Sequence, residues 1–283
     1  MLTPAKINLF LRIVGRRPDG YHELDSLFLP ISLFDRIAIE TDAAAVSAVS
    51  LRCNWPEMPL DARNLAVQAA ELFVAHAGLR MRVDIDLHKE IPAGAGLGGG
   101  SSDAGAVLRA LASMHGADPA ALAALALKIG ADVPFFLDPR PARVGGVGER
   151  ITYLEGDFTL HLVIGVPPVS VPTAEIYRYL VRHQWSGPGP AILPSPLDAS
   201  GVGRELLVND LEAVAAARYP QIGELEILLE DLGASGVAMS GSGGAVFGLF
   251  HSPGQAQRAA AAAAARMPSA RFVAIRVLGS DGV

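Results

Sequence analysis

Apolar side chains recur at every second position in several stretches of the chain, and this period of two predicts β-strands. The alternation is clearest in residues 5–14 and in residues 81–90, where one face of each strand would be buried. Further apolar segments bounded by turn residues predict strands in residues 24–34, 36–40, 143–170, 236–250 and 271–278.

Apolar positions three and four residues apart predict helices between these strands. One helix lies within residues 61–78 and ends at Gly78, and another begins with Asp118 as its cap and Pro119 in its first turn. A helix in residues 103–116 has a predicted buried stripe formed by Val107, Leu108, Leu111 and Met114. The remaining helices are predicted in residues 206–219, in residues 222–233 and close to the C-terminal end.

The order of these elements predicts an α+β fold, because the strands come in pairs between helices. A domain boundary is predicted near residue 153, which divides the chain into residues 1–153 and 154–283. Residues 185–201 are rich in proline, glycine and serine and are predicted to form a loop outside the core.

Composition narrows the classes of function. The net charge of −6 argues against a general nucleic-acid binder, although a local cradle of amides can still hold a small anion. No apolar run reaches the roughly 20 residues that cross a bilayer. The single cysteine, Cys53, excludes a disulfide within the chain and a cysteine-built zinc site, so we expect a reducing, cytoplasmic environment. The histidines lack metal-ligand spacing, and no protein-built metal site is predicted.

The most informative segment is IPAGAGLGGGSSDAG, residues 91–105, which lies between a predicted strand and a predicted helix. The first amides of a helix have no hydrogen-bond partner and carry partial positive charge, and glycines let the backbone approach a phosphate closely. This segment is therefore predicted to bind an anion.

Several known phosphate-binding motifs have glycines between a strand and a helix, as this segment does. Gly94, Gly96 and Gly99 match the dinucleotide pattern G-x-G-x-x-G, but a run of glycines makes a chance match easy. A Walker A loop would need Gly-Lys before its Ser or Thr, whereas Gly100 precedes Ser101 here. The protein-kinase motifs H-R-D and D-F-G are absent. A purely structural glycine loop is the remaining alternative.

Other motifs along the chain favour one kind of phosphate site. The loop P-x-x-x-G-L-G-G-G-S-S, Pro92 to Ser102, resembles the phosphate loop of the GHMP small-molecule kinases. The resemblance extends over nearly the full length through the motifs PAKINLFL (4–11), DGYHEL (19–24), IGADVPFF (129–136), VPTAEIY (171–177), LVNDLE (207–212) and SGSGGAVFG (240–248).

The resemblance implies an N-terminal domain like ribosomal S5 domain 2, a C-terminal ferredoxin-like domain and a cleft between them. It implies an ATP-dependent kinase that uses Mg²⁺ and phosphorylates an alcohol. Among these kinases the chain is most similar to those whose substrate is a cytidine diphosphate derivative of methylerythritol, in non-mevalonate isoprenoid synthesis. A monomer or a homodimer is expected, with no nucleic-acid or membrane partner.

The resemblance also assigns residues to the ATP phosphates. The phosphate-binding segment consists of Pro92, Ala93, Gly94, Ala95, Gly96, Leu97, Gly98, Gly99, Gly100, Ser101 and Ser102. A second glycine turn is expected to lie against the phosphates or to support that segment, and it consists of Ser240, Gly241, Ser242 and Gly243. From the residues alone this second turn could equally be a plain hairpin turn.

The resemblance places Lys6 and Asp132 at the catalytic centre. Asp132 would take or orient the acceptor hydroxyl proton, and Lys6 would keep Asp132 ionised and stabilise the transferred phosphoryl group. From the residues alone, Lys6 could be a solvated side chain at a strand start and Asp132 could cap a turn after Gly130. An aspartate beside an apolar block nevertheless requires a partner.

Five further residues are expected to bind the substrate. Asn8 lies two positions from Lys6 on the same strand face, and the resemblance assigns it to the methylerythritol part. Tyr21 and His22 are assigned to the cytosine, with Tyr177 on its other face and Thr173 nearby. Without the resemblance, Tyr21 could pack over a turn and His22 could be exposed.

Overall fold

Strands and helices alternate along the chain in the computed structural model, which describes residues 1–181, 184–203 and 206–279. The strands are β1 (Leu2–Arg16), β2 (His22–Ala43), β3 (Ala48–Cys53), β4 (Met81–His88), β5 (Ala142–Gly146), β6 (Arg150–Tyr153), β7 (Phe158–Thr159), β8 (His161–Val166), β9 (Leu197–Asp198), β10 (Val237–Met239), β11 (Val246–Phe250) and β12 (Arg271–Arg276). The helices are α1 (Leu65–His76), α2 (Gly99–His115), α3 (Pro119–Ile129), α4 (Thr173–Tyr179), α5 (Glu212–Arg218), α6 (Gln221–Asp231), α7 (Pro253–Arg266) and the 3-10 helix η1 (Pro134–Leu137).

Two large sheets organise these elements, and β7 and β9 form a separate parallel pair. The first has the order β3-β4-β2-β5-β6 with β1 paired to β2, and its pairs are antiparallel except for β3 with β4. The second has the order β10-β11-β8-β12 and is antiparallel throughout. Helices separate β8 from β10 and β11 from β12, which is the split βαβ arrangement of a ferredoxin-like domain. The predicted α+β class is confirmed.

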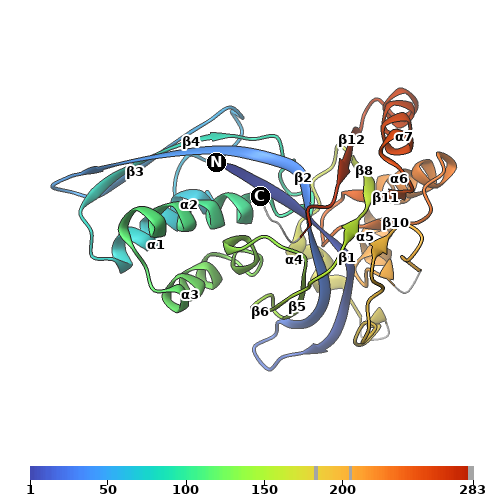
Figure 1. The fold of residues 1–283 in the computed structure, drawn as a ribbon, viewed down its shortest axis with the longest axis horizontal. Coiled ribbons are helices and arrows are strands. Elements are labelled where there is room, and N and C mark those ends of the chain that lie inside the picture. The colour runs from blue at the N-terminus through green and yellow to red at the C-terminus, as the bar shows by residue number, and fades with distance from the viewer. Residues whose placement is uncertain (182–183, 204–205, 280–283) are drawn as a thin grey trace.

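Helices α1, α2 and α3 cover one face of the first sheet (Figure 1). Their apolar side chains form a core with the inward face of β4, where Val83, Ile85 and Leu87 are almost fully buried. The predicted alternation in residues 81–90 is therefore confirmed, and the strand leaves this core directly ahead of the glycine loop.

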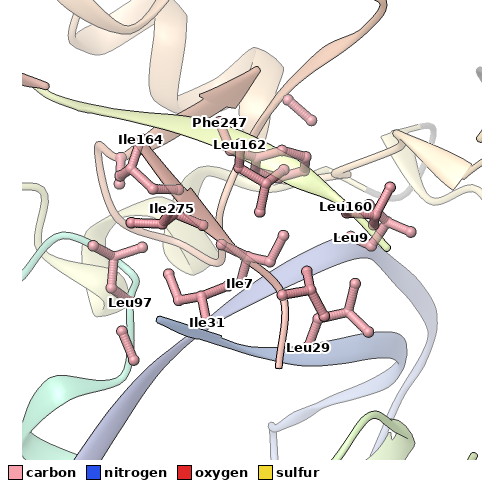
Figure 2. Close-up of a cluster of buried hydrophobic side chains, with 14 of the residues drawn as sticks. Ile7, Leu9, Leu29, Ile31, Leu97, Leu160, Leu162, Ile164, Phe247 and Ile275 are labelled. Carbon is pink, nitrogen blue, oxygen red and sulfur yellow. The ribbon is translucent and has the colours of Figure 1, made fainter. Parts of the chain in front are cut away.

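A separate core lies between the two sheets (Figure 2). Ile7 and Leu9 of β1 point into it and meet side chains of the second sheet such as Leu162 and Phe247. Because successive side chains of a strand point to opposite faces, Lys6 and Asn8 face away from this core. Burial of the apolar face of β1 thus fixes the direction of its polar face.

The structure corrects four details of the predicted elements. Residues 24–34 and 36–40 belong to one continuous strand, β2. The second helix begins at Gly99, inside the glycine segment, and its predicted apolar stripe ends before Met114, which is 52% exposed. The helix predicted from residue 206 begins only at Glu212, because the preceding backbone hydrogen-bonds to Leu11 of β1.

The division into residues 1–153 and 154–283 stays a prediction, since both sheets contribute to the core in Figure 2. Within the described residues, no helix combines the length and the apolar character that crossing a membrane requires.

A buried ionic cluster ties α2 to the first sheet. The ammonium of Lys89, just after β4, contacts the carboxylate of Asp35 on β2 and lies 2.8 Å from Oδ2 of Asp103 on α2. Asp35 also accepts the backbone N–H of Ile91, and Thr3 donates to Asp103. Burial, together with the charge of Asp35, raises the pKa of Asp103 to about 7, although Lys89 acts in the opposite direction.

We expect Lys89→Met to lower the free energy of unfolding by about 3–5 kcal/mol, because it leaves two buried carboxylates without their cation. Urea denaturation measures this loss. Arg52→Met is the matched control, since its guanidinium is 78% exposed and its ion pair with Asp86 should contribute little. Equal stabilities of the two variants would contradict a structural role for the cluster.

Candidate active site

A cavity of about 940 Å³ opens where β1, the glycine segment, the turn before η1 and the start of α4 meet. Most of the predicted site residues line it, although they come from segments far apart in the sequence. The predicted residues in its lining are Lys6, Asn8, Tyr21, His22, Pro92 to Ser101, Asp132, Thr173, Tyr177, Gly241 and Ser242. The structure therefore brings together the four groups that the sequence motifs suggested.

The glycine segment forms the wall of the cavity that is built from backbone. Gly94, Gly96 and Gly98 have φ angles of 68°, 80° and 73°, a region that favours glycine. No side chain caps the first turn of α2, which begins at Gly99. The helix start therefore presents free amides and the positive end of its dipole to the cavity, as an anion site requires.

The second glycine turn supports the first. Ser240 donates from its hydroxyl to the carbonyl of Gly96 at 3.2 Å, and the amide of Ala245 donates to the carbonyl of Ala95 at 3.1 Å. The two backbones approach so closely that a Cβ on Gly243 would lie 2.1 Å from the nitrogen of Gly96. This turn was expected either to lie against the phosphates or to support the glycine segment. Ser240 and Gly243 do not line the cavity, so these two residues support the segment.

Lys6 lies at the base of the cavity and is 3% exposed, so it is not a solvated lysine. Its ammonium donates to Oδ1 of Asn8 at 2.5 Å and to the carbonyl of Gly96 at 3.1 Å. It also lies 3.5 Å from Oδ2 of Asp132 and 4.8 Å from the centre of the Phe28 ring. Three distant segments thus converge on one positive charge.

The electrostatics of this pair follow from unequal burial. Burial lowers the pKa of Lys6, and the charge of Asp132 acts in the opposite direction. The carboxylate of Asp132 is 33% exposed and faces the cavity, where a ligand can reach it. An ammonium and a carboxylate therefore meet at the point where the cavity also presents helix amides.

A second part of the cavity wall, here called the aromatic end, is formed by the rings of Tyr21, His22 and Tyr177. His22 stacks on Tyr177 with ring centres 5.4 Å apart and an interplanar angle of 29°. Tyr21 is 66% exposed at the rim, and Thr173 exchanges a hydrogen bond of 2.7 Å with Ser242. In the structure the imidazole of His22 lies on the Tyr177 ring, so these two rings form one stacked pair in the cavity wall.

Ser102 does not reach the cavity, contrary to the prediction that it binds phosphate. Its side chain is 1% exposed, and its hydroxyl donates to the carbonyl of Pro4 at 2.7 Å. The helix begins one turn earlier than predicted, which turns Ser102 toward β1 and leaves Ser101 at the cavity wall.

Sequence reasoning missed Asn209, whose role is to shape the site. Its side-chain amide donates at 2.8 Å to two carbonyls, that of Met239 just before the second glycine turn and that of Gly241 within it. The motif LVNDLE was part of the resemblance, but nothing in its spacing assigned the asparagine to that turn.

The alternative of a dinucleotide site differs from what is observed. The strand before the glycine segment, β4, pairs antiparallel with β2 in a mixed sheet, whereas a dinucleotide fold places this loop in a parallel sheet. Within residues 1–181, 184–203 and 206–279, no group of three or more acidic, histidine or cysteine side chains forms a metal site.

Comparison with known proteins agrees with this geometry. The family models for the GHMP kinases N terminal domain and the GHMP kinases C terminal domain match residues 64–138 and 197–269. The chain is 42% identical over 262 residues to the 4-diphosphocytidyl-2-C-methyl-D-erythritol kinase of Syntrophotalea carbinolica, which covers 92% of each chain. It is 45% identical over 268 residues to the corresponding kinase of Anaeromyxobacter sp. (strain K), covering 92% of this chain and 83% of the relative.

Solved structures show the same similarity. A crystal structure of 4-(cytidine 5′-diphospho)-2C-methyl-D-erythritol kinase matches with a TM-score of 0.85 and 40% identity, covering 99% of both chains. Homoserine kinase from Cytophaga hutchinsonii shares the fold with a TM-score of 0.75 at 18% identity, covering 99% of this chain and 95% of the other.

We expect Gly243→Ala to weaken ATP binding at least about tenfold and to lower Tm, because its Cβ would force the backbone of Gly96 away. Titration calorimetry with ATP and a thermal melt measure both effects. Gly244→Ala is the matched control for ATP binding, since the nearest neighbours of its Cβ would be side-chain atoms of Pro167 at 3.0 Å and Val171 at 3.3 Å and not the backbone of the glycine segment. If both variants bind ATP alike, the second turn does not support the first.

Proposed function

The chain belongs to the 4-diphosphocytidyl-2-C-methyl-D-erythritol kinase family of the GHMP kinases, and on that premise we propose that it phosphorylates the 2-hydroxyl of 4-(cytidine 5′-diphospho)-2-C-methyl-D-erythritol with ATP. This reaction belongs to the non-mevalonate route to isoprenoids. The observation that carries the proposal is the meeting of Lys6 and Asp132, 3.5 Å apart, beside the open start of α2 in one cavity.

The proposed reaction transfers the γ-phosphoryl group to the alcohol oxygen. The bond from phosphorus to the β-phosphate oxygen breaks, a bond to the 2-oxygen forms, and ADP leaves. The transition state demands positioning and charge stabilisation rather than covalent catalysis by the protein. The carboxylate of Asp132 accepts a hydrogen bond from the 2-hydroxyl group of the substrate. This bond orients the hydroxyl oxygen toward phosphorus, and Asp132 takes the hydroxyl proton as the new bond forms.

The remaining groups stabilise the phosphates and the acceptor. The free amides of residues 99–101 and the helix dipole bind phosphate oxygens. Lys6 stays an ammonium because Asn8, Gly96 and Asp132 surround it, and its charge stabilises the moving phosphoryl group. Asn8 also donates from its amide to Ser26, which holds its oxygen toward Lys6.

Mg²⁺ is proposed to enter with ATP, where it supplies neutralisation of phosphate charge. Among the described residues that line the cavity, Asp132 is the only acidic side chain. A hard cation held mainly by nucleotide oxygens and water fits this lining, in which Asp132 and the hydroxyl of Ser101 would be the side-chain oxygens available to it. Ser102, whose hydroxyl is bonded to Pro4, is not part of this set.

The aromatic end of the cavity is proposed to hold the cytosine. Tyr21 is exposed at the rim and can close over a base, while His22 and Tyr177 offer a ring edge and a ring face. Stacking on an aromatic side chain contributes about 1–3 kcal/mol per base. A GHMP kinase for a different alcohol is the competing function, and it would not need this end of the cavity. Cytoplasmic location and a monomeric or homodimeric state stay predictions.

We expect Lys6→Ala and Asp132→Ala each to lower kcat at least about 10²-fold while the protein remains folded, because each removes charge at the reacting centre. Coupled ADP release measures turnover, and circular dichroism checks the fold. Lys128→Ala, an exposed lysine on α3, is the matched control. Near-normal turnover of either folded variant would overturn the catalytic assignment.

We expect Tyr21→Ala to raise KM for the cytidylyl substrate roughly 5- to 150-fold while KM for ATP changes little, because a stacking partner of the base is lost. Steady-state kinetics with each substrate varied in turn measures the difference. Tyr179→Ala removes a 45% exposed tyrosine that does not line the cavity and serves as control. An unchanged KM would favour a kinase for another alcohol.

A further inference from the structure

Residues 185–190, here called the strap, belong to the segment predicted to be a loop outside the core. Ser186 donates its backbone N–H to Oδ2 of Asp210 at 2.8 Å, and its hydroxyl donates to the other oxygen of that carboxylate. The same Oδ2 accepts the amide of Ile13 on β1 at 2.7 Å. Asp210 therefore joins the start of the strap to the strand that carries the site.

The other end of the strap is held by a second charged group. Arg143 of β5 forms a two-pronged ion pair with Asp25 of β2, and the amide of Gly189 donates to Oδ2 of Asp25 at 2.7 Å. Arg143 also donates to the carbonyl of Pro190 at 2.9 Å. A loop with this many charge-assisted bonds is a fixed part of the structure.

The strap places Trp185 against the aromatic end of the cavity. The indole lies edge-on to His22, with ring centres 5.7 Å apart and an interplanar angle of 89°. Tyr177 stacks on the same imidazole at 5.4 Å. His22 and Tyr177 line the cavity but Trp185 does not, so Trp185 reaches a ligand only through His22.

Packing, and not a hydrogen bond, holds the indole there. Its Nε1 is buried and has no acceptor in the part of the chain that the structure describes. A buried donor without an acceptor is costly, and the packing of the ring against His22 offsets that cost. Phenylalanine could supply the same edge without that donor.

We propose that Trp185 is a positioning residue of the cytosine site, which fixes the plane of His22 and thereby the orientation in which the enzyme accepts a pyrimidine. The inference rests on the proposed function, because it needs the aromatic end of the cavity to be the base site. It assigns a role in recognition to the strap, a segment that none of the motifs covers.

The role predicts a selective effect. Without the edge of the indole, the imidazole of His22 can rotate about its Cβ–Cγ bond. Its ring nitrogens are then no longer held in one direction toward the edge of the base. Among the described residues, no hydrogen bond, ion pair or ring contact joins the strap to the glycine segment or to Lys6. Cytidine nucleotides should therefore bind more weakly, while adenine nucleotides at the phosphate loop should bind as before.

The test compares the binding of CDP and ADP by titration calorimetry to the wild-type protein and to Trp185→Ala. We expect Kd for CDP to rise about 3- to 10-fold, with Kd for ADP and kcat within twofold of wild type. Trp185→Phe should restore CDP binding to within about twofold. Ile192→Ala, 87% exposed in the same loop, is the control that should change nothing. If Trp185→Ala does not fold, Trp185→Leu gives the same comparison with the apolar volume retained.

Three outcomes would overturn the inference. CDP affinity unchanged in the alanine or leucine variant would show that the ring edge does not position His22. An equal loss of CDP and ADP affinity would show a merely structural role. A wild-type protein that binds ADP but no CDP would remove the proposed base site and the inference with it, whereas loss of the inference alone leaves wild-type CDP binding intact.

Discussion

A single buried ammonium, that of Lys6, holds the site together. A lysine with so little exposure loses its hydrogen bonds to water, and oxygens of the protein must accept hydrogen bonds from the ammonium in their place. Those oxygens come from β1 itself, from the glycine segment and from the turn before η1. Each segment must therefore reach its native place before the charge is satisfied, so that forming the site and completing the fold are coupled.

Two other charged groups act in the same way around the cavity. Lys89 anchors the start of α2 behind the glycine segment, and Arg143 with Asp25 anchors the strap behind the aromatic end. In each case a buried or half-buried ion pair lies outside the cavity and orders a piece of irregular backbone that lines or supports it. Both ends of the cavity thus rest on ion pairs that lie behind them.

Much of this was predictable from the sequence where local patterns decide the outcome. The alternation in residues 81–90, the cap at Asp118 and the glycine segment before a helix each follow from neighbouring residues alone. The meeting of Lys6 and Asp132 was expected only through the resemblance, since 126 positions separate them and no local rule brings them together. The burial of Ser102 and the contact of Trp185 with His22 depend on where α2 starts and on how the strap is bonded, which no pattern in either segment encodes.

The two faces of β1 have a consequence for the history of this chain. Ile7 and Leu9 fill the core between the sheets, while Lys6 and Asn8 face the cavity. Alternate residues of one strand therefore serve the packing of the core and the chemistry of the site. Inserting or deleting one residue here would exchange the two sets, so that a charged side chain would face the apolar core and an isoleucine would face the cavity. Substitutions can accumulate gradually along this strand, but changes of length cannot, and the spacing from Pro4 to Asn8 should be among the most slowly varying features of the lineage.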